Sequence, residues 1–475
     1  MIRRSPLICV VALSGVLAAV PAIPAAPPAP AHLSRSAQAD AIVRDALKAG
    51  PYPGVSVAIE QHGKVVYQRG FGLADLERKV SVTPQIRFPI GSITKSFTCL
   101  SVMQLTAAGQ VALDKTAGDY LPDLPAPSRS VKIRQLLNHT SGIPNYTDLP
   151  DFPLSRSVGM SRQQVLGYFA SKPLLFEPGS TFNYSNSDTY ILGLIVEKVS
   201  GQPYDQYVRS HVLLPFGMTR SSFDARDDGA ADRARGYKMG KTGFQRSEPY
   251  DFEIPFSAGA LVSTTPDLLR YRQGVFGPKT SSKVRDLVLQ QVPMTDGTAN
   301  PYALGCLVVT QMDGHAKITH AGDIFGFSAD YAYYPDDDLT IAIATNSQGA
   351  TFPPISIEHR LARLFLGLPP LKAADAAVPA DLGQALAGDY EVGRFRMGFE
   401  RLGFIFKDGV LSASVGGLSS GAPPLALRYQ GGGHFISSKD EEQSFDFRRQ
   451  PDGSVGVVLH FYEGAIAAHK PAPKG

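Results

Sequence analysis

Apolar and polar residues alternate from Gly54 to Phe71, and His62-Gly63 separates the two alternating runs. Period-two alternation is typical of half-buried strands, and a short polar break with glycine is typical of a hairpin turn. This segment is therefore predicted to be a β-hairpin. From Ser92 to Gly109 the spacing becomes that of a helix that ends at glycine, with apolar residues at Ile93, Phe97, Leu100 and Ala107.

The same patterns predict further elements along the chain. Helices are expected over 37–49, 189–199, 203–213 and 353–366, and strands over 317–319, 327–334 and 339–345. Pro203 suits the first position of its helix, where the missing N–H costs nothing. Between about 110 and 250, helices are mixed with long loops rich in Pro, Asp and Ser.

The composition changes at residues 368–378, a Pro- and Ala-rich stretch that resembles a linker. Beyond it, strand-like runs are joined in pairs by turn signals. Asp408-Gly409 joins 404–407 to 410–415, and Pro451-Asp452-Gly453 joins 445–449 to 455–462. Turn signals at this spacing predict a small all-β barrel or sandwich.

The first 31 residues have the organisation of an export signal. Arg3 and Arg4 are basic, residues 6–20 are apolar, and a small-residue site such as Ala29-Pro30-Ala31 follows. The apolar run is shorter than the roughly 20 residues that span a bilayer. We expect a periplasmic or extracellular protein with no membrane span in the mature chain. Three segments are predicted: a signal and linker over 1–31, a main domain over 32–370, and a small β-domain over 371–475.

Composition and charge narrow the possible partners. Lys plus Arg is 46 against 43 Asp plus Glu, the formal net charge is +3, and no block of like charge stands out. A basic face for nucleic acid is therefore not expected.

Beyond the signal the cysteines are Cys99 and Cys306, and their wide separation favours two buried thiols over a required disulfide. No Cys/His cluster has metal-ligand spacing, so neither a metal nor a cofactor is expected.

The sharpest chemical feature is Ser92-Ile93-Thr94-Lys95, the only Ser-x-x-Lys in the chain. On a helix, positions i and i+3 share a face, so a hydroxyl and an amine can meet by local geometry. A serine hydroxyl needs a base to become a nucleophile, and lysine can be that base if burial and positive potential lower its pKa. A helix N-terminus after Gly91 would supply part of that potential, and the N–H of Ser92 could bind an oxyanion.

Two other motifs could contribute to such a site. In Tyr184-Ser185-Asn186, a tyrosine can act as general acid or base beside a cation, and an asparagine can bind a substrate amide. In His320-Ala321-Gly322, the glycine would let a substrate approach the backbone, and the N–H of Asp323 could be a second oxyanion donor. Taken alone, Tyr184-Ser185-Asn186 is more typical of an ordinary loop, and His320-Ala321-Gly322 is equally compatible with a surface histidine.

Two similar motifs are rejected on context. Lys241-Thr242-Gly243 has the pattern of His320-Ala321-Gly322 with lysine in place of histidine. It follows a polar, Gly-rich stretch that is typical of a hairpin tip. Residues 417–421 match the nucleophile elbow of α/β-hydrolases, which requires a following helix. Ala422-Pro423-Pro424 follows instead, so this segment is predicted to be a loop.

Together the motifs resemble the serine β-lactamase-like family, which includes class C β-lactamases, D-Ala-D-Ala carboxypeptidases, D-aminopeptidases and esterases. The resemblance covers about residues 35–367. It includes three flanking stretches: 88–91, 133–143 and 257–264. The C-terminal segment more weakly resembles the lipocalin-like β-domain that some members append. The family implies an α/β (α+β) fold, in which an antiparallel sheet flanked by helices lies beside a mainly helical lobe, followed here by the small barrel-like domain.

The resemblance also implies roles. Ser92 would be the acylated nucleophile, Lys95 and Tyr184 would transfer protons, and Asn186 would hold the substrate amide. His320, beside Gly322, would stand where typical β-lactamases have lysine, and this departure puts efficient lactam turnover in doubt. His139 could be a further proton carrier, but shaping its loop is the favoured interpretation.

Three functions remain open at this stage. The first is an exported acyl-serine hydrolase of a peptide, amide or ester, of the carboxypeptidase, D-aminopeptidase or esterase type. The second is a class C-like β-lactamase. The third is a non-catalytic sensor that binds peptidoglycan fragments or β-lactams. The expected partner is a small-molecule or peptide substrate, and the oligomeric state stays open.

Overall fold

The computed structural model describes residues 33–50, 52–153, 159–223, 230–248, 253–348, 353–374, 376–396, 399–421, 423–461 and 464–472. The predicted export signal lies outside these residues. In the described part of the chain, no helix is both long and apolar enough to cross a bilayer.

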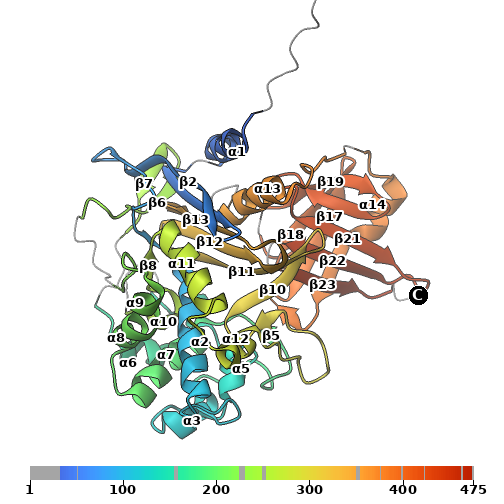
Figure 1. Ribbon diagram of the computed structural model, residues 1–475. Coiled ribbons are helices and arrows are strands. Elements are labelled where there is room, and N and C mark those ends of the chain that lie inside the picture. The colour runs from blue at the N-terminus through green and yellow to red at the C-terminus, as the bar shows by residue number, and fades with distance from the viewer. Residues whose placement is uncertain are drawn as a thin grey trace, which may run out of the picture.

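An antiparallel sheet of eight strands lies at the centre of the main domain, in the order β3-β2-β1-β13-β12-β11-β10-β9 (Figure 1). Its strands are β1 (Gly54–Gln61), β2 (Lys64–Asp75), β3 (Val80–Ser81), β9 (Tyr302–Ala303), β10 (Leu307–Met312), β11 (His315–Ile324), β12 (Phe327–Tyr334) and β13 (Leu339–Thr345). The hairpin predicted over 54–71 is β1 and β2, and β12 and β13 have the predicted bounds. After β9 the chain forms β10, β11, β12 and β13 in turn, and β13 pairs with β1. The first and last parts of the main domain therefore meet in one sheet.

Helices cover both faces of this sheet. On one face, α1 (Arg35–Ala49) and α13 (Pro354–Leu366) pack over alternate residues of β1, namely Val55, Val57 and Ile59. On the other face, α11 (Thr265–Phe276) packs against β1 and β13. A strand whose residues are buried on both faces forms the middle of a three-layer arrangement.

The remaining helices form a lobe below the sheet in the view of Figure 1. They are α2 (Thr94–Ala107), α3 (Ala117–Tyr120), α4 (Ala126–Arg129), α5 (Ile133–Leu137), α6 (Arg162–Phe169), α7 (Asn186–Ser200), α8 (Tyr204–Val208), α9 (Leu214–Phe216), α10 (Phe256–Gly259) and α12 (Ser282–Leu289). The helix predicted over 203–213 is α8 followed by a π-helical turn, Arg209–Leu213. Residues 94–103 of α2 are all buried, as expected for a helix enclosed on every side.

Short strands complete the main domain. They are β4 (Phe88–Pro89), β5 (Phe182–Asn183), β6 (Tyr237–Gly240), β7 (Gly243–Arg246), β8 (Val262–Ser263) and β14 (Ser347–Gln348). The rejected Lys241-Thr242-Gly243 lies at the tip of the β6–β7 hairpin, as predicted.

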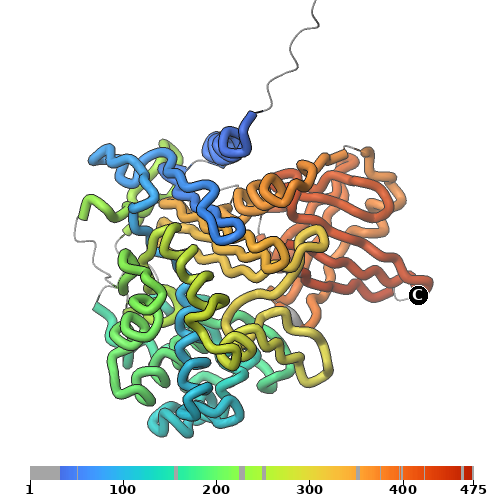
Figure 2. The backbone as a smooth tube through the Cα atoms, viewed as in Figure 1, coloured from blue at the N-terminus to red at the C-terminus, as the bar shows by residue number. Residues whose placement is uncertain are grey.

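The C-terminal segment forms a closed eight-stranded barrel, coloured orange to red in Figure 2. After α14 (Ala380–Leu386), its strands are β15 (Gly388–Val392), β17 (Arg401–Lys407), β18 (Val410–Val415), β19 (Leu425–Gly431), β20 (His434–Ser437), β21 (Ser444–Arg449), β22 (Val455–Phe461) and β23 (Gly464–Lys470). Its centre is filled by packed aromatic rings: Tyr390, Phe404, Phe435, Phe445 and Phe447. Side chains rather than an open ligand cavity therefore occupy this part of the barrel.

The expectation of two free thiols is wrong. Cys99 on α2 and Cys306, just before β10, form a disulfide with Cα atoms 5.8 Å apart. They are 207 residues apart in sequence, and the fold brings them together because α12 packs against both α2 and β10. The disulfide ties the helix that carries Lys95 to the sheet.

Removal of this disulfide is expected to destabilise the protein. Cys99→Ser together with Cys306→Ser should lower the free energy of unfolding by about 2–5 kcal/mol, because the cross-link restricts the unfolded chain. Urea unfolding with and without reductant measures this. Reductant should shift the midpoint of the wild type but not that of the double variant; equal midpoints for the wild type in both conditions would contradict the prediction.

Candidate active site

Ser92 lies in a single 3₁₀ turn, Gly91–Ile93, that leads into α2. Gly91 has φ +52°, and a Cβ built on it would lie 2.8 Å from the backbone nitrogen of Asp323. Only glycine combines this left-handed backbone with such close contact to β11. The turn is therefore pressed against the sheet, and Ser92 is half-buried at the boundary between sheet and helical lobe.

Lys95 lies one turn after Ser92 and is fully buried. Its Nζ is 2.9 Å from Ser92 Oγ, 2.7 Å from Asn186 Oδ1 and 2.8 Å from the carbonyl oxygen of Ala258. The motif thus juxtaposes a hydroxyl and an amine as its spacing predicts. Asn186 and Ala258 belong to α7 and α10, so two further helices fix the position of the amine.

Burial holds the pKa of Lys95 well below its usual value, although Asp188 opposes the effect. Asp188, on α7, is also fully buried, and burial raises its pKa well above that of an ordinary carboxyl group. Desolvation disfavours the charged form of each group. The amine and the carboxyl are therefore both held toward their neutral forms.

Tyr184 follows β5 directly and brings an aromatic ring to the amine. The Nζ of Lys95 is 4.8 Å from the centroid of the Tyr184 ring. The ring also packs on His139, with centroids 4.6 Å apart, and lies 6.4 Å from the ring of His320. The second motif and the first are thus adjacent in space although about 90 residues separate them.

His139 and Asp188 form a buried polar pair behind Tyr184. His139 Nδ1 is 3.1 Å from Asp188 Oδ2, and the hydroxyl of Ser141 donates to Asp188 Oδ1 at 2.5 Å. Burial holds the pKa of His139 well below its usual value. Its φ of +55° lies in the left-handed region that non-glycine residues seldom adopt, and such strain is found where surrounding contacts fix it. The loop-shaping interpretation of His139 agrees with these contacts.

His320 lies on β11 with both ring nitrogens close to protein atoms. Nε2 is 2.8 Å from the Tyr302 hydroxyl, and Nδ1 is 2.5 Å from the carbonyl oxygen of Ala321. Burial lowers the pKa of His320 to about 3. A neutral imidazole therefore occupies the third-motif position.

Gly322 lets β11 approach the Ser92 turn. A Cβ at this position would lie 2.0 Å from the carbonyl oxygen of Ile90 and 2.9 Å from the Ser92 nitrogen. The pairing of β11 with β10 ends at Thr319, so beyond that point this edge of β11 faces the Ser92 turn instead of a strand. The carboxylate of Asp323 accepts a hydrogen bond from the Ser328 hydroxyl. The group predicted to bind an oxyanion is the backbone N–H of Asp323.

The structure brings Ser92, Lys95, Tyr184 and Asn186 together and lays His320-Ala321-Gly322 beside them. Within the protein, Asn186 Oδ1 accepts from Lys95, and its Nδ2 donates to Thr147 at 3.0 Å. Sequence reasoning missed three neighbours, namely Asp188, Tyr302 and the Ala258 carbonyl. Only Ala258 had a signal, because it lies in the flanking stretch 257–264. Asp188 lies in the first turn of α7, and Tyr302 lies in a two-residue strand.

These features define a serine-centred site between an antiparallel sheet and a helical lobe. Residues 39–364 match the family model described as Beta-lactamase, and the chain belongs to that family. It shares its fold with penicillin-binding protein homologues and D-amino acid amidases.

One curated relative and two solved structures show what the chain is similar to. "Protein flp" of Staphylococcus aureus (strain MW2) is 29% identical over 332 residues, covering 68% of this chain and 65% of that protein. The octameric penicillin-binding protein homologue from Pyrococcus abyssi superposes with a TM-score of 0.65 at 23% identity, covering 91% of this chain and 99% of that one. The D-amino acid amidase from Ochrobactrum anthropi SV3 has a TM-score of 0.61 at 21% identity, covering 70% and 99%. This chain thus spans about two-thirds of the length of the curated relative.

Proposed function

We propose that the protein is an exported serine hydrolase that acts through an acyl-serine intermediate on a peptide, amide or ester. The observation that carries the proposal is the buried Lys95 amine 2.9 Å from the Ser92 hydroxyl. A base within hydrogen-bond distance of a nucleophile, itself oriented by third groups, is the geometry of an activated serine.

The contacts of Lys95 indicate how a neutral amine would work as the base. Asn186 Oδ1 and the Ala258 carbonyl are acceptors and can take its two N–H groups. The remaining lone pair then faces Ser92 Oγ, whose O–H donates to it. As Ser92 Oγ forms a bond to the substrate carbonyl carbon, its proton passes to Lys95.

The second half of the acylation step needs a proton donor at the leaving group. The bond from the carbonyl carbon to the leaving nitrogen or oxygen breaks, and the leaving atom takes a proton through Tyr184 from Lys95. Water then hydrolyses the acyl-serine and regenerates the Ser92 hydroxyl. The Lys95 amine lies 4.8 Å from the centroid of the Tyr184 ring before substrate binds, which lowers the cost of bringing the two residues together.

Two backbone N–H groups are proposed to stabilise the oxyanion. Ser92 N–H and Asp323 N–H lie on the two segments that Gly91 and Gly322 bring into contact. Two such donors aimed at one point stabilise the charge that develops on the carbonyl oxygen. Beyond Thr319, β11 is no longer paired with β10, and we propose that an extended substrate adds to the sheet along this part of the strand.

A D-amino acid amide, D-peptide or ester is the proposed substrate class. The support is the fold shared with D-amino acid amidases and the neutral His320 in place of a lysine. Periplasmic or extracellular location agrees with the predicted signal and with the disulfide, which persists in oxidising compartments. We also propose that the main domain begins at residue 32 and ends at residue 370, where the β-domain follows.

Covalent labelling tests this function directly. The purified chain is incubated with a fluorophosphonate probe, and the modified peptide is identified by mass spectrometry. We expect one adduct on the peptide that contains Ser92, because only a hydroxyl with a base beside it reacts readily. An unlabelled Ser92 under conditions that label a known serine hydrolase would contradict the proposal.

The β-lactamase and sensor alternatives are separated by turnover. A screen against D-amino acid amides, D-peptides, short-chain esters and a chromogenic cephalosporin should give turnover of the first three classes. With the cephalosporin we expect a slowly released acyl adduct. Rapid cephalosporin hydrolysis would favour the β-lactamase, and labelling without turnover of any substrate would favour the sensor.

A further inference from the structure

The segment that presents Tyr184 is held from two sides, and one of those sides belongs to the barrel. The connection between β15 and β17 leaves the barrel and forms β16 (Phe395–Arg396), which pairs in parallel with β5. In this register Phe395 lies beside Phe182, and Arg396 lies beside Asn183. Tyr184 is the next residue of the chain.

The backbone hydrogen bonds on the two sides come from different domains. The N–H of Phe182 donates to the carbonyl oxygen of Arg394 in the barrel connection at 2.8 Å, whereas the N–H of Asn183 donates to the carbonyl oxygen of His139 at 2.9 Å. Successive residues of an extended chain direct their N–H groups to opposite sides. The barrel therefore supplies one of the two backbone neighbours of the strand that leads into Tyr184.

Arg394 fastens this junction with its side chain. Its Nη1 donates to the carbonyl oxygen of Ser180 at 3.0 Å, and its Nε lies 2.6 Å from Asp296 Oδ2. The loop that carries Asp296 is itself tied to the same segment, because the N–H of Thr295 donates to the carbonyl oxygen of Gly179 at 2.9 Å. Three segments distant in sequence thus converge immediately before Tyr184.

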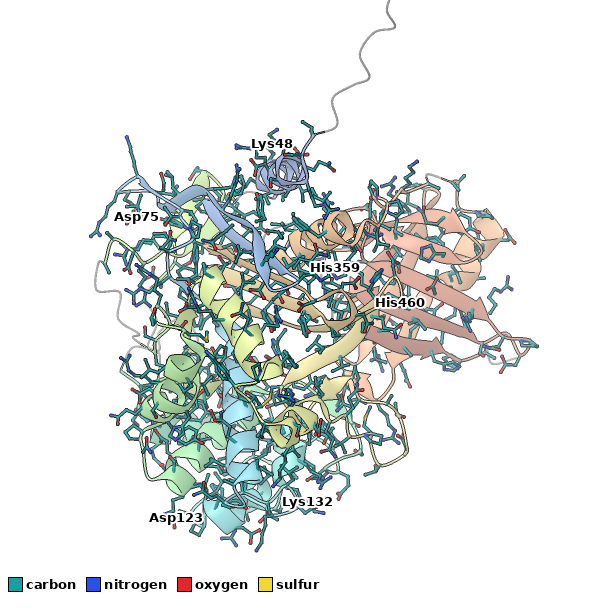
Figure 3. All side chains as sticks on the ribbon, viewed as in Figure 1. Lys48, Asp75, Asp123, Lys132, His359 and His460 are labelled. Atoms are coloured by element: carbon teal, nitrogen blue, oxygen red, sulfur yellow. A yellow bond between two sulfur atoms is a disulfide. The ribbon has the colours of Figure 1, made fainter. Side chains whose placement is uncertain are left out.

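A second contact between barrel and main domain lies away from this site. On α13, His359 is 3.1 Å from Glu442 and Arg363 is 3.0 Å from the same carboxylate. Figure 3 labels His359 near the boundary of the two domains. The barrel is thus anchored at α13 independently of β16, so the pairing of β16 with β5 is not needed merely to attach it.

From these contacts we infer that the barrel completes the active site by positioning Tyr184, with β16 as the outer partner of β5 and Arg394 as its clamp. The inference rests on the role proposed for Tyr184 above. Arg394 and β16 are positioning elements, because their effect on the reacting atoms passes through β5. A displacement of about 1 Å in a catalytic group can cost about 10²-fold in rate, whereas an exposed ion pair such as Arg394–Asp296 contributes about 0–1 kcal/mol to stability.

Point variants in the full-length chain test the inference. Arg396→Pro removes a backbone N–H from β16 and prevents regular pairing with β5. It should lower kcat, and the rate of Ser92 labelling by the fluorophosphonate probe, on the order of 10²-fold. Arg396→Gln loses the same side chain but keeps the backbone, so its loss should be much smaller. Arg394→Gln should lower both rates about 10-fold, and Arg394→Lys, which keeps a cation for Asp296, should recover part of this loss.

Arg428→Gln is the control, because Arg428 forms an ion pair with Glu441 within the barrel. It should leave kcat and labelling unchanged. Thermal unfolding of each variant verifies that the barrel remains folded. Equal labelling rates for Arg396→Pro and wild type would overturn the inference, as would parallel losses in Arg396→Pro and Arg396→Gln. If the wild type itself is not labelled at Ser92, the proposed function fails instead, and the two failures are thereby distinguished.

Discussion

Ser92→Ala is expected to lower kcat for a D-amino acid amide or a p-nitrophenyl ester on the order of 10⁴-fold or more. The substitution removes the only atom that can form the acyl bond, while Lys95, Tyr184 and the oxyanion donors remain. Residual catalysis from binding and oxyanion stabilisation alone is small in serine hydrolases. Initial rates with a chromogenic substrate measure the loss, and intact-mass spectrometry should show no acyl adduct.

A matched control is available on the same helix. Ser101 on α2 is also buried, and its hydroxyl donates to the carbonyl oxygen of Phe97. Ser101→Ala should retain the wild-type kcat. If Ser92→Ala retains wild-type turnover, Ser92 is not the nucleophile and another residue must form the intermediate.

Lys95→Met should lower kcat by about 10²–10⁴-fold, the usual contribution of a general base. Its side chain fills a similar volume but cannot accept the proton of Ser92. Lys95→Arg provides a sharper comparison, because arginine is a cation that does not deprotonate in proteins. Both variants should be inactive to a similar degree. Substantial activity in Lys95→Arg would show that position 95 acts as a cation rather than as a base.

The pH dependence of the wild type tests the same base. The free amine is the active form, and burial holds the pKa of Lys95 well below the usual 10.5. Activity should therefore be full at pH values well below 10.5 and should fall as the pH drops through the lowered pKa, because Lys95 then binds a proton. A kcat/KM profile measured across this range reports the free enzyme. A rate that keeps rising up to pH 10.5 would indicate an unperturbed lysine.

Local patterns predicted many individual elements. The hairpin β1–β2, the strands β12 and β13 and the helix α13 follow from periodicity and turn residues within about 20 positions of each other. The match is poorer at 203–213, where one helical pattern became α8 and a π-helical turn. The conformation of this segment depends on its packing against α2 and α7 as well as on local propensity. Hydrophobic spacing alone does not predict that packing.

The contacts of the candidate site are likewise of two kinds, local and long-range. Ser92 and Lys95 are neighbours because they are three residues apart at the start of a helix, so their contact is a property of the local sequence. The partners of Lys95 and His320 come from elsewhere in the chain: Asn186, Ala258 and Tyr302. No spacing rule connects such positions, because it is the chain path that makes them adjacent.

By itself the sequence determined the alternation of strands and helices, the contact of Ser92 with Lys95, the resemblance to the family and the mainly β character of the C-terminal segment. The tertiary structure decided the rest. It closed the disulfide, buried Lys95 and Asp188 together, and placed the barrel beside the strand that leads into Tyr184. The physical reason is range: periodicity and turn chemistry act over a few residues, whereas burial, desolvation and the contact of distant segments exist only once the chain has folded.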